Sequence, residues 1–117
     1  MATFPLKLHD TKPSLVVALL NADLSAFNLT GTTEWFLHIL RADGMTVVSR
    51  PMVKHGTDAE GLLRYDWVAS DWTSDLVVGE HLMEYEVIDN GGGRMTFPNG
   101  KEVFDTLSVG RDIADGS

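Results

Sequence analysis

The segment HLMEYEVIDNGGGRMTFP, residues 81–98, carries the clearest structural pattern in the chain. Its first half alternates between two faces, with Met83, Tyr85 and Val87 on one and Leu82, Glu84 and Glu86 on the other. A period of two is typical of a strand that has one core face and one wetter face. The residues 90–93, NGGG, then favour a turn, because glycine takes positive φ without strain. The segment therefore predicts a hairpin whose second strand is Arg94–Pro98.

Short apolar segments recur on both sides of this hairpin at intervals of about ten residues, the spacing of strands in a sandwich or small barrel. The predicted strands are Thr33–Arg41, Met45–Ser49 after a turn at residues 42–44, Leu62–Val68, and Glu102–Val109 after a turn at Asn99–Gly100. In the third of these, Leu63, Tyr65 and Trp67 share one face. The pattern predicts an all-β protein with a single domain over residues 1–117.

Two segments fit more than one structure. Residues 14–27 also fit a helix capped by Ser14, but Pro13 and the turn at residues 28–31 bracket a short unit, which favours a strand over Leu15–Leu20. Residues 69–76 are expected to form a loop or a single helical turn that packs Trp72 against the sandwich.

Composition excludes several classes of function. The chain is 44% apolar and 22% charged, which is typical of a globular protein. It has no cysteine, which excludes disulfides and thiolate zinc sites and favours a reducing cytoplasm. Its formal net charge of −8 and its scattered basic residues argue against nucleic-acid binding. We expect no secretion signal and no membrane span, because the longest clean apolar run is Leu15–Leu20.

Motifs for catalysis and for cofactor binding are missing from the sequence. It contains no Gly-x-Ser-x-Gly elbow, P-loop, dinucleotide fingerprint or His-Glu-x-x-His. Gly91–Gly93 lack the Lys-Ser/Thr and the helix of a phosphate loop, so a hairpin turn is favoured. We therefore predict no catalytic residue, no cofactor and no metal, and classify the protein as a non-enzyme.

Two sets of residues carry side chains that could ligate a metal. The histidines are His9, His38, His55 and His81. They lie on separate segments, and a zinc site needs at least three converging ligands. Asp71 to Asp75 and the pair Asp58 and Glu60 lack the spacing and central glycine of a calcium loop, so solvated carboxylates are expected.

Two further sets suggest a ligand site or a glycosidase pair. Glu84 and Glu86 share a strand face, as paired carboxylates in glycoside cleavage would, but they more simply keep that face wet. Trp35, Trp67 and Trp72 would suit a cleft, yet large aromatics in a domain this small are chiefly core. A hydrolase or isomerase would require a pocket with His38 or His81 beside carboxylates.

The order of these signals resembles the immunoglobulin-like N-terminal domain of phage baseplate upper proteins and related tailed-phage virion structural proteins. The resemblance covers residues 10–109. Its marks are Asp-Thr-x-Pro at Asp10 to Pro13, Asn-Leu-Thr-Gly at residues 28–31, Asp43-Gly44, Gly61 leading to Tyr65 and Trp67, and Thr96-Phe97-Pro98. The chain departs from it at His81 and Leu82, where such domains place an aromatic.

The resemblance implies an immunoglobulin-like antiparallel β-sandwich of about 7–8 strands. It implies a structural subunit of a tailed-phage virion, which acts as a tail or baseplate adaptor. The implied partners are other virion proteins in a symmetric, multi-copy assembly, with no nucleic acid and no membrane. The alternatives are a capsid head decoration protein on the same fold and a carbohydrate-binding β-sandwich.

Overall fold

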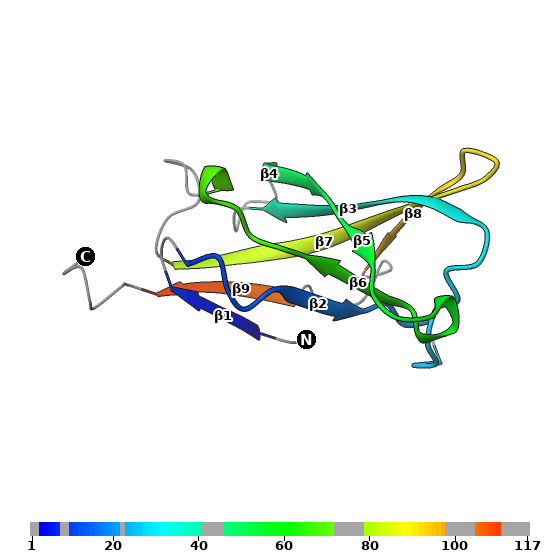
Figure 1. The fold of residues 1–117 in the computed structure, drawn as a ribbon, viewed down its shortest axis with the longest axis horizontal. Helices are drawn as coiled ribbons and strands as arrows, with labels where there is room; N and C mark the ends of the chain where they lie inside the picture. The colour runs from blue at the N-terminus through cyan, green and yellow to red at the C-terminus, as the bar shows by residue number, and fades with distance from the viewer. Residues whose placement is uncertain are drawn as a thin grey trace.

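The structure is a computed structural model that describes residues 3–7, 10–21, 23–40, 46–71, 79–97 and 105–110. Two β-sheets pack face to face and enclose one hydrophobic core (Figure 1). The predicted sandwich is therefore confirmed. None of the helices that the described residues form is long and apolar enough to cross a membrane.

The larger sheet has six strands. In spatial order its path is β1 (Thr3–Lys7), β9 (Asp105–Gly110), β7 (Gly79–Asp89), β3 (Thr32–Leu40) and β4 (Thr46–Pro51), with β8 (Arg94–Phe97) paired to β7 beyond the end of β9. The predicted antiparallel pairing has one exception, because β1 runs parallel to β9. Side-chain alternation assigns the faces of a strand but not its direction.

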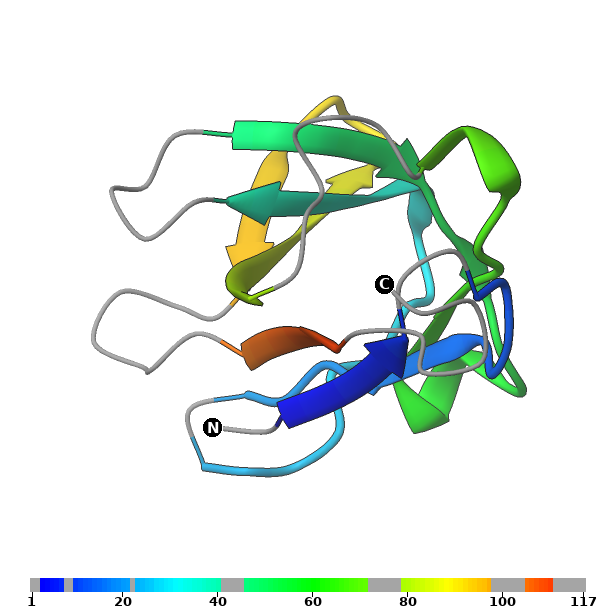
Figure 2. The same cartoon turned by 90° about the vertical axis from the view of Figure 1, so that its left-hand side faces the viewer.

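The smaller sheet has three strands, in the order β2 (Leu15–Ala18), β6 (Leu62–Tyr65) and β5 (Val53–Lys54). Two short 3-10 turns, η1 (Asp58–Glu60) and η2 (Ala69–Asp71), flank β6. Figure 2 shows the two layers end on, with β1 beside β2 at the margin where the sheets approach each other. This margin holds the cleft described below.

The core consists of the inward faces of both sheets, and the predicted faces are confirmed. Leu63, Tyr65 and Trp67 are buried from the smaller sheet, while Met83, Tyr85 and Val87 are buried from the larger one. Burial of this apolar surface is the main stabilising contribution to such a fold.

The local predictions hold where the structure describes the residues. Leu15–Ala18 form a strand and not a helix, and Leu20 adds an isolated bridge to Ala26. The predicted hairpin joins β7 to β8, with Asp89 N–H bonded to the carbonyl of Gly93 at 2.9 Å. The turns predicted at residues 42–44 and 99–100, and Trp72, lie outside the described residues.

Candidate binding cleft

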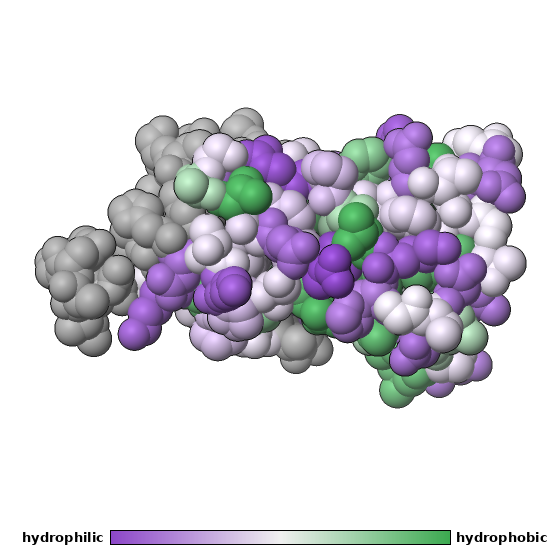
Figure 3. Space-filling model, in the orientation of Figure 1, coloured by the Kyte–Doolittle hydropathy of each residue, from purple (hydrophilic) through white to green (hydrophobic). Residues whose placement is uncertain are grey.

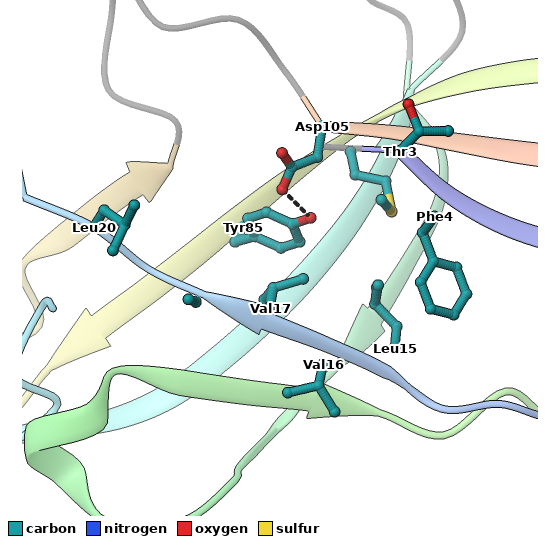
Figure 4. A pocket seen from close by; sticks show the side chains of 10 residues that line it. Thr3, Phe4, Leu15, Val16, Val17, Leu20, Tyr85 and Asp105 are labelled. Atoms are coloured by element: carbon teal, nitrogen blue, oxygen red, sulfur yellow. Dashed lines mark hydrogen bonds between the residues drawn. The ribbon is translucent and has the colours of Figure 1, made fainter. Parts of the chain in front are cut away.

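A cleft of about 490 Å³ opens between β1 and β2. Its lining comes from both sheets and consists of Thr3, Phe4, Leu15, Val16, Val17, Ala18, Leu20, Met83, Tyr85 and Asp105. Figure 4 shows these side chains around the open space, with β2 as one wall. The volume lies in the range of ligand pockets, about 300–1,000 Å³.

The polar part of the cleft is one hydrogen-bonded pair. The Tyr85 hydroxyl donates to Asp105 Oδ2 at 2.9 Å, and Tyr85 is buried whereas Asp105 is half-buried (Figure 4). Burial, and then the adjacent Asp105 carboxylate, raise the pKa of the Tyr85 phenol well above its ordinary value. The phenol therefore remains protonated at neutral pH, and Asp105 is the carboxylate in the lining.

Apart from Thr3, the rest of the lining is apolar, and part of it lies at the surface. Val16 is 43% exposed and Leu20 is 37% exposed, although both are large aliphatic side chains. Phe4 is half-buried, and its ring centroid lies 6.2 Å from that of Trp67. The cleft therefore offers a mainly apolar surface with one carboxylate, a composition common in ligand pockets.

The larger sheet carries a second polar arrangement on its outer face, where β4, β3, β7 and β8 lie side by side. His38 Nδ1 lies 2.8 Å from Ser49 Oγ, and His38 Nε2 lies 3.0 Å from Glu86 Oε1. Arg94 Nε lies 2.5 Å from Glu86 Oε2. The structure thus confirms that Glu84 and Glu86 point away from the core, and it joins Glu86 to His38.

Ser49, His38 and Glu86 have the order of a nucleophile, a base and an orienting acid. The three side chains lie on adjacent strands of the larger sheet, with Ser49 on β4, His38 on β3 and Glu86 on β7. Their bonds therefore link three strands across the outer face of the sheet. We therefore interpret this chain of bonds as cross-strand stabilisation.

The three histidines that the structure describes, His38, His55 and His81, do not converge. His81 is buried on the core side of β7, and the backbone N–H of His55 donates to the Leu62 carbonyl at 2.9 Å. His9 lies outside the described residues. Across the described parts of the chain, no three side chains of metal-ligating type come together in a cation site.

Asp71 is a buried charge, so the expectation of a solvated carboxylate is wrong for this residue. It is 0% exposed, and it accepts hydrogen bonds from the Tyr65 hydroxyl at 2.7 Å, Val68 N–H at 2.9 Å and Arg50 Nε at 2.7 Å. The sequence alone could not predict this contact, because Arg50 lies on β4, 21 positions before Asp71 in the chain. Asp75 lies outside the described residues.

The acidic pair in η1 is also engaged within the fold. Lys54 Nζ lies 2.8 Å from Asp58 Oδ1, and Glu60 Oε1 accepts a hydrogen bond from Thr57 N–H at 2.8 Å. The bonds from Thr57 lower the pKa of Glu60. Both carboxylates thus stabilise a turn.

The glycine stretch is a turn and not a phosphate loop. Asp89 Oδ1 accepts hydrogen bonds from the N–H groups of Gly91, at 2.9 Å, and Gly93, at 2.8 Å. Gly92 has a φ of 82°. The turn prediction is therefore confirmed.

Neither of the two described tryptophans is part of the cleft lining. Trp67 is 3% exposed within the core, as predicted. Trp35 packs partly against the core and donates from Nε1 to Thr32 Oγ1 at 2.9 Å. Sequence reasoning missed the cleft, because Phe4 and Asp105 stand in no recognisable motif and meet only in the folded chain.

Comparison with known proteins gives a likeness of fold. No family model matches the chain, and no curated protein matches it. Among solved structures it is similar to CopC from Methylosinus trichosporium OB3b, with a TM-score of 0.48 and 15% identity over 95% of this chain and 86% of that one. At this level the likeness concerns the fold alone.

This comparison corrects the predicted function. The chain is similar to CopC, a protein from Methylosinus trichosporium OB3b and not from a phage, and the predicted tailed-phage tail or baseplate subunit is withdrawn. Its alternatives, head decoration and carbohydrate binding, are not retained. The resemblance to baseplate domains stays a prediction, because no family model tests it.

Proposed function

We propose that this protein is a non-catalytic binding domain and that the cleft between β1 and β2 is its binding site. The observation that carries the proposal is the cleft itself: about 490 Å³ of mainly apolar lining with the Tyr85–Asp105 pair inside it. Apolar pockets with a few polar groups are the usual form of a binding site.

The surface around the cleft supports this function. The front of the molecule in Figure 3 is mostly hydrophilic, and apolar side chains stand there singly or in small groups. Val16 and Leu20 belong to both the exposed apolar set and the cleft lining. Exposed aliphatic side chains at the rim of a concave site favour association with an apolar partner.

The proposal is tested with a neutral apolar dye, Nile red, and two matched variants. Thr3→Trp places a large ring at the rim, and Lys7→Trp places the same ring at another exposed position of β1 outside the cleft lining. We expect saturable binding to the wild type and to Lys7→Trp, and about tenfold weaker binding to Thr3→Trp. Equal binding by both variants, or none by the wild type, would contradict the proposal.

A further inference from the structure

We propose that the occupant of the cleft is an extended peptide segment that adds a strand to the free edge of β2 and places a basic side chain near Asp105. This inference rests on the proposed function, since it names the occupant of the same site. Four observations carry it: the free backbone groups of β2, its lack of edge protection, the pattern of the lining, and the charge.

One edge of β2 carries no neighbouring strand among the residues that the structure describes. Within the described residues β2 pairs only with β6, and the register joins Leu15 to Tyr65 and Val17 to Leu63. Leu19 N–H continues this series, donating to the Gly61 carbonyl at 2.9 Å. Because successive residues of a strand point their backbone groups in opposite directions, those of Val16 and Ala18 point away from β6.

The unused edge lacks the usual protection against another strand. Natural edge strands carry charges, prolines or bulges that prevent pairing. The four residues of β2, Leu-Val-Val-Ala, include none of these. In the described part of the chain, the backbone groups of Val16 and Ala18 have no backbone hydrogen-bond partner.

The lining shows that the cleft runs along this edge. A ligand resting on one face of a strand would contact alternate residues, but the cleft is lined by four consecutive residues, Leu15–Ala18, and by Leu20. An occupant therefore meets the backbone of β2 as well as its side chains. An added strand would form main-chain bonds there and insert alternate side chains toward Phe4, Met83 and Tyr85.

The negative charge of the site and of the chain indicates which kind of peptide would bind. Asp105 is the carboxylate in the lining, and the chain as a whole has a formal net charge of −8. Such a field attracts a basic peptide and disfavours a second copy of this acidic chain. The occupant is therefore a segment of alternating apolar residues that contains Lys or Arg.

The test sorts a displayed library of random octapeptides with the wild-type protein and, in parallel, with Ala18→Pro. Proline at this exposed position removes an edge N–H without removing a bond to β6, and edge strands tolerate it. Melting curves confirm that the variant is folded. We expect enriched peptides that alternate apolar residues with Lys or Arg and bind Ala18→Pro about tenfold more weakly.

A second readout is independent of the variant. The amides of Val16 and Ala18 are expected to exchange with deuterium more slowly when an enriched peptide is bound. Equal binding to Ala18→Pro, unchanged exchange at these amides, or no enrichment would overturn the inference. So would wild-type dimers that dissociate in Ala18→Pro, because the second copy would then be the occupant.

The charge is tested with Asp105→Asn, and Glu84→Gln is the control because it removes a carboxylate on the far face of the larger sheet. Asp105→Asn should weaken the binding of a lysine-containing peptide but not the binding of its norleucine analogue. If the peptide tests fail while Thr3→Trp still weakens the binding of Nile red, this inference alone is overturned. Dye binding that is insensitive to Thr3→Trp overturns the proposed function instead.

Discussion

The guanidinium of Arg50 neutralises a carboxylate that water does not reach: its Nε lies 2.7 Å from Oδ1 of Asp71, which is fully buried. The pair joins the end of β4 to η2. Removing one member of such a pair is costly, because the other charge stays buried.

Arg50→Ala should therefore lower the free energy of unfolding by about 2–3 kcal/mol. The Tyr65 hydroxyl and Val68 N–H still bind the carboxylate, and Arg50 is partly exposed, so the loss stays below that of a fully isolated charge. Urea denaturation measures it. The isolated surface pair of Lys54 and Asp58 is the control, and Lys54→Ala should cost less than about 1 kcal/mol. Similar values for the two variants would contradict the role given to Asp71.

The face assignment of the strands is tested by one core and one outer residue. Trp67→Ala should cost about 3–5 kcal/mol, because the ring is buried in the core. Glu84→Ala should change the free energy of unfolding by no more than about 0.5 kcal/mol, because its side chain lies on the outer face. Equal losses would mean that the faces are wrongly assigned.

Those faces could be predicted from the sequence because alternation along one strand is a local property. The strand β1 could not be predicted in the same way, since Pro5 interrupts TFPLK and a proline argues against a central strand. It is tolerated there because β1 is an edge strand, paired only with β9 among the described residues. That pairing joins residues about a hundred positions apart, which no local pattern reveals.

The cleft and the Asp71 site could not be predicted either, because both depend on contacts between residues that are far apart in the sequence. Phe4, Val17 and Asp105 lie on three strands that only the fold brings together. The sequence predicts a solvated carboxylate at Asp71, because nothing in it marks Arg50 and Tyr65 as hydrogen-bond donors to that side chain. A strand's faces are encoded locally, whereas a site assembled from several strands is not.

Alkaline pH should destabilise the fold through its two buried tyrosines. Burial, together with the Asp71 carboxylate, raises the pKa of Tyr65, and burial with Asp105 raises that of Tyr85, both from an ordinary value of 10.0. Below about pH 10 both states hold the phenol protons. Above it the unfolded chain releases them while the folded chain retains them, so the free energy of unfolding falls as pH rises.

Urea midpoints between about pH 8 and 11.5 measure this effect. The doubly substituted variant Tyr65→Phe, Tyr85→Phe should show a shallower decline than the wild type above about pH 10, because neither phenol remains to titrate. An identical decline would assign the alkaline loss to other groups.

The polar chain on the outer face gives a prediction about chemistry. If Ser49, His38 and Glu86 only stabilise the sheet, Ser49 should not react with a fluorophosphonate probe above the level seen in Ser49→Ala. Intact-protein mass spectrometry measures the adduct. Labelling that requires both Ser49 and His38 would contradict the non-catalytic function.

Two glycines with similar φ should respond differently to alanine. Gly61 has a φ of 66°, and an added Cβ would lie 2.5 Å from the Phe27 carbonyl oxygen. Gly92 has a φ of 82°, but nothing lies within 4 Å of its Cβ position. Gly92→Ala should therefore cost about 1–2 kcal/mol from backbone strain alone. Gly61→Ala adds a steric clash with backbone and should cost about 3 kcal/mol or more. Denaturation of both variants under the same conditions measures the difference, and equal costs would show that the segment carrying Phe27 can move away from β6.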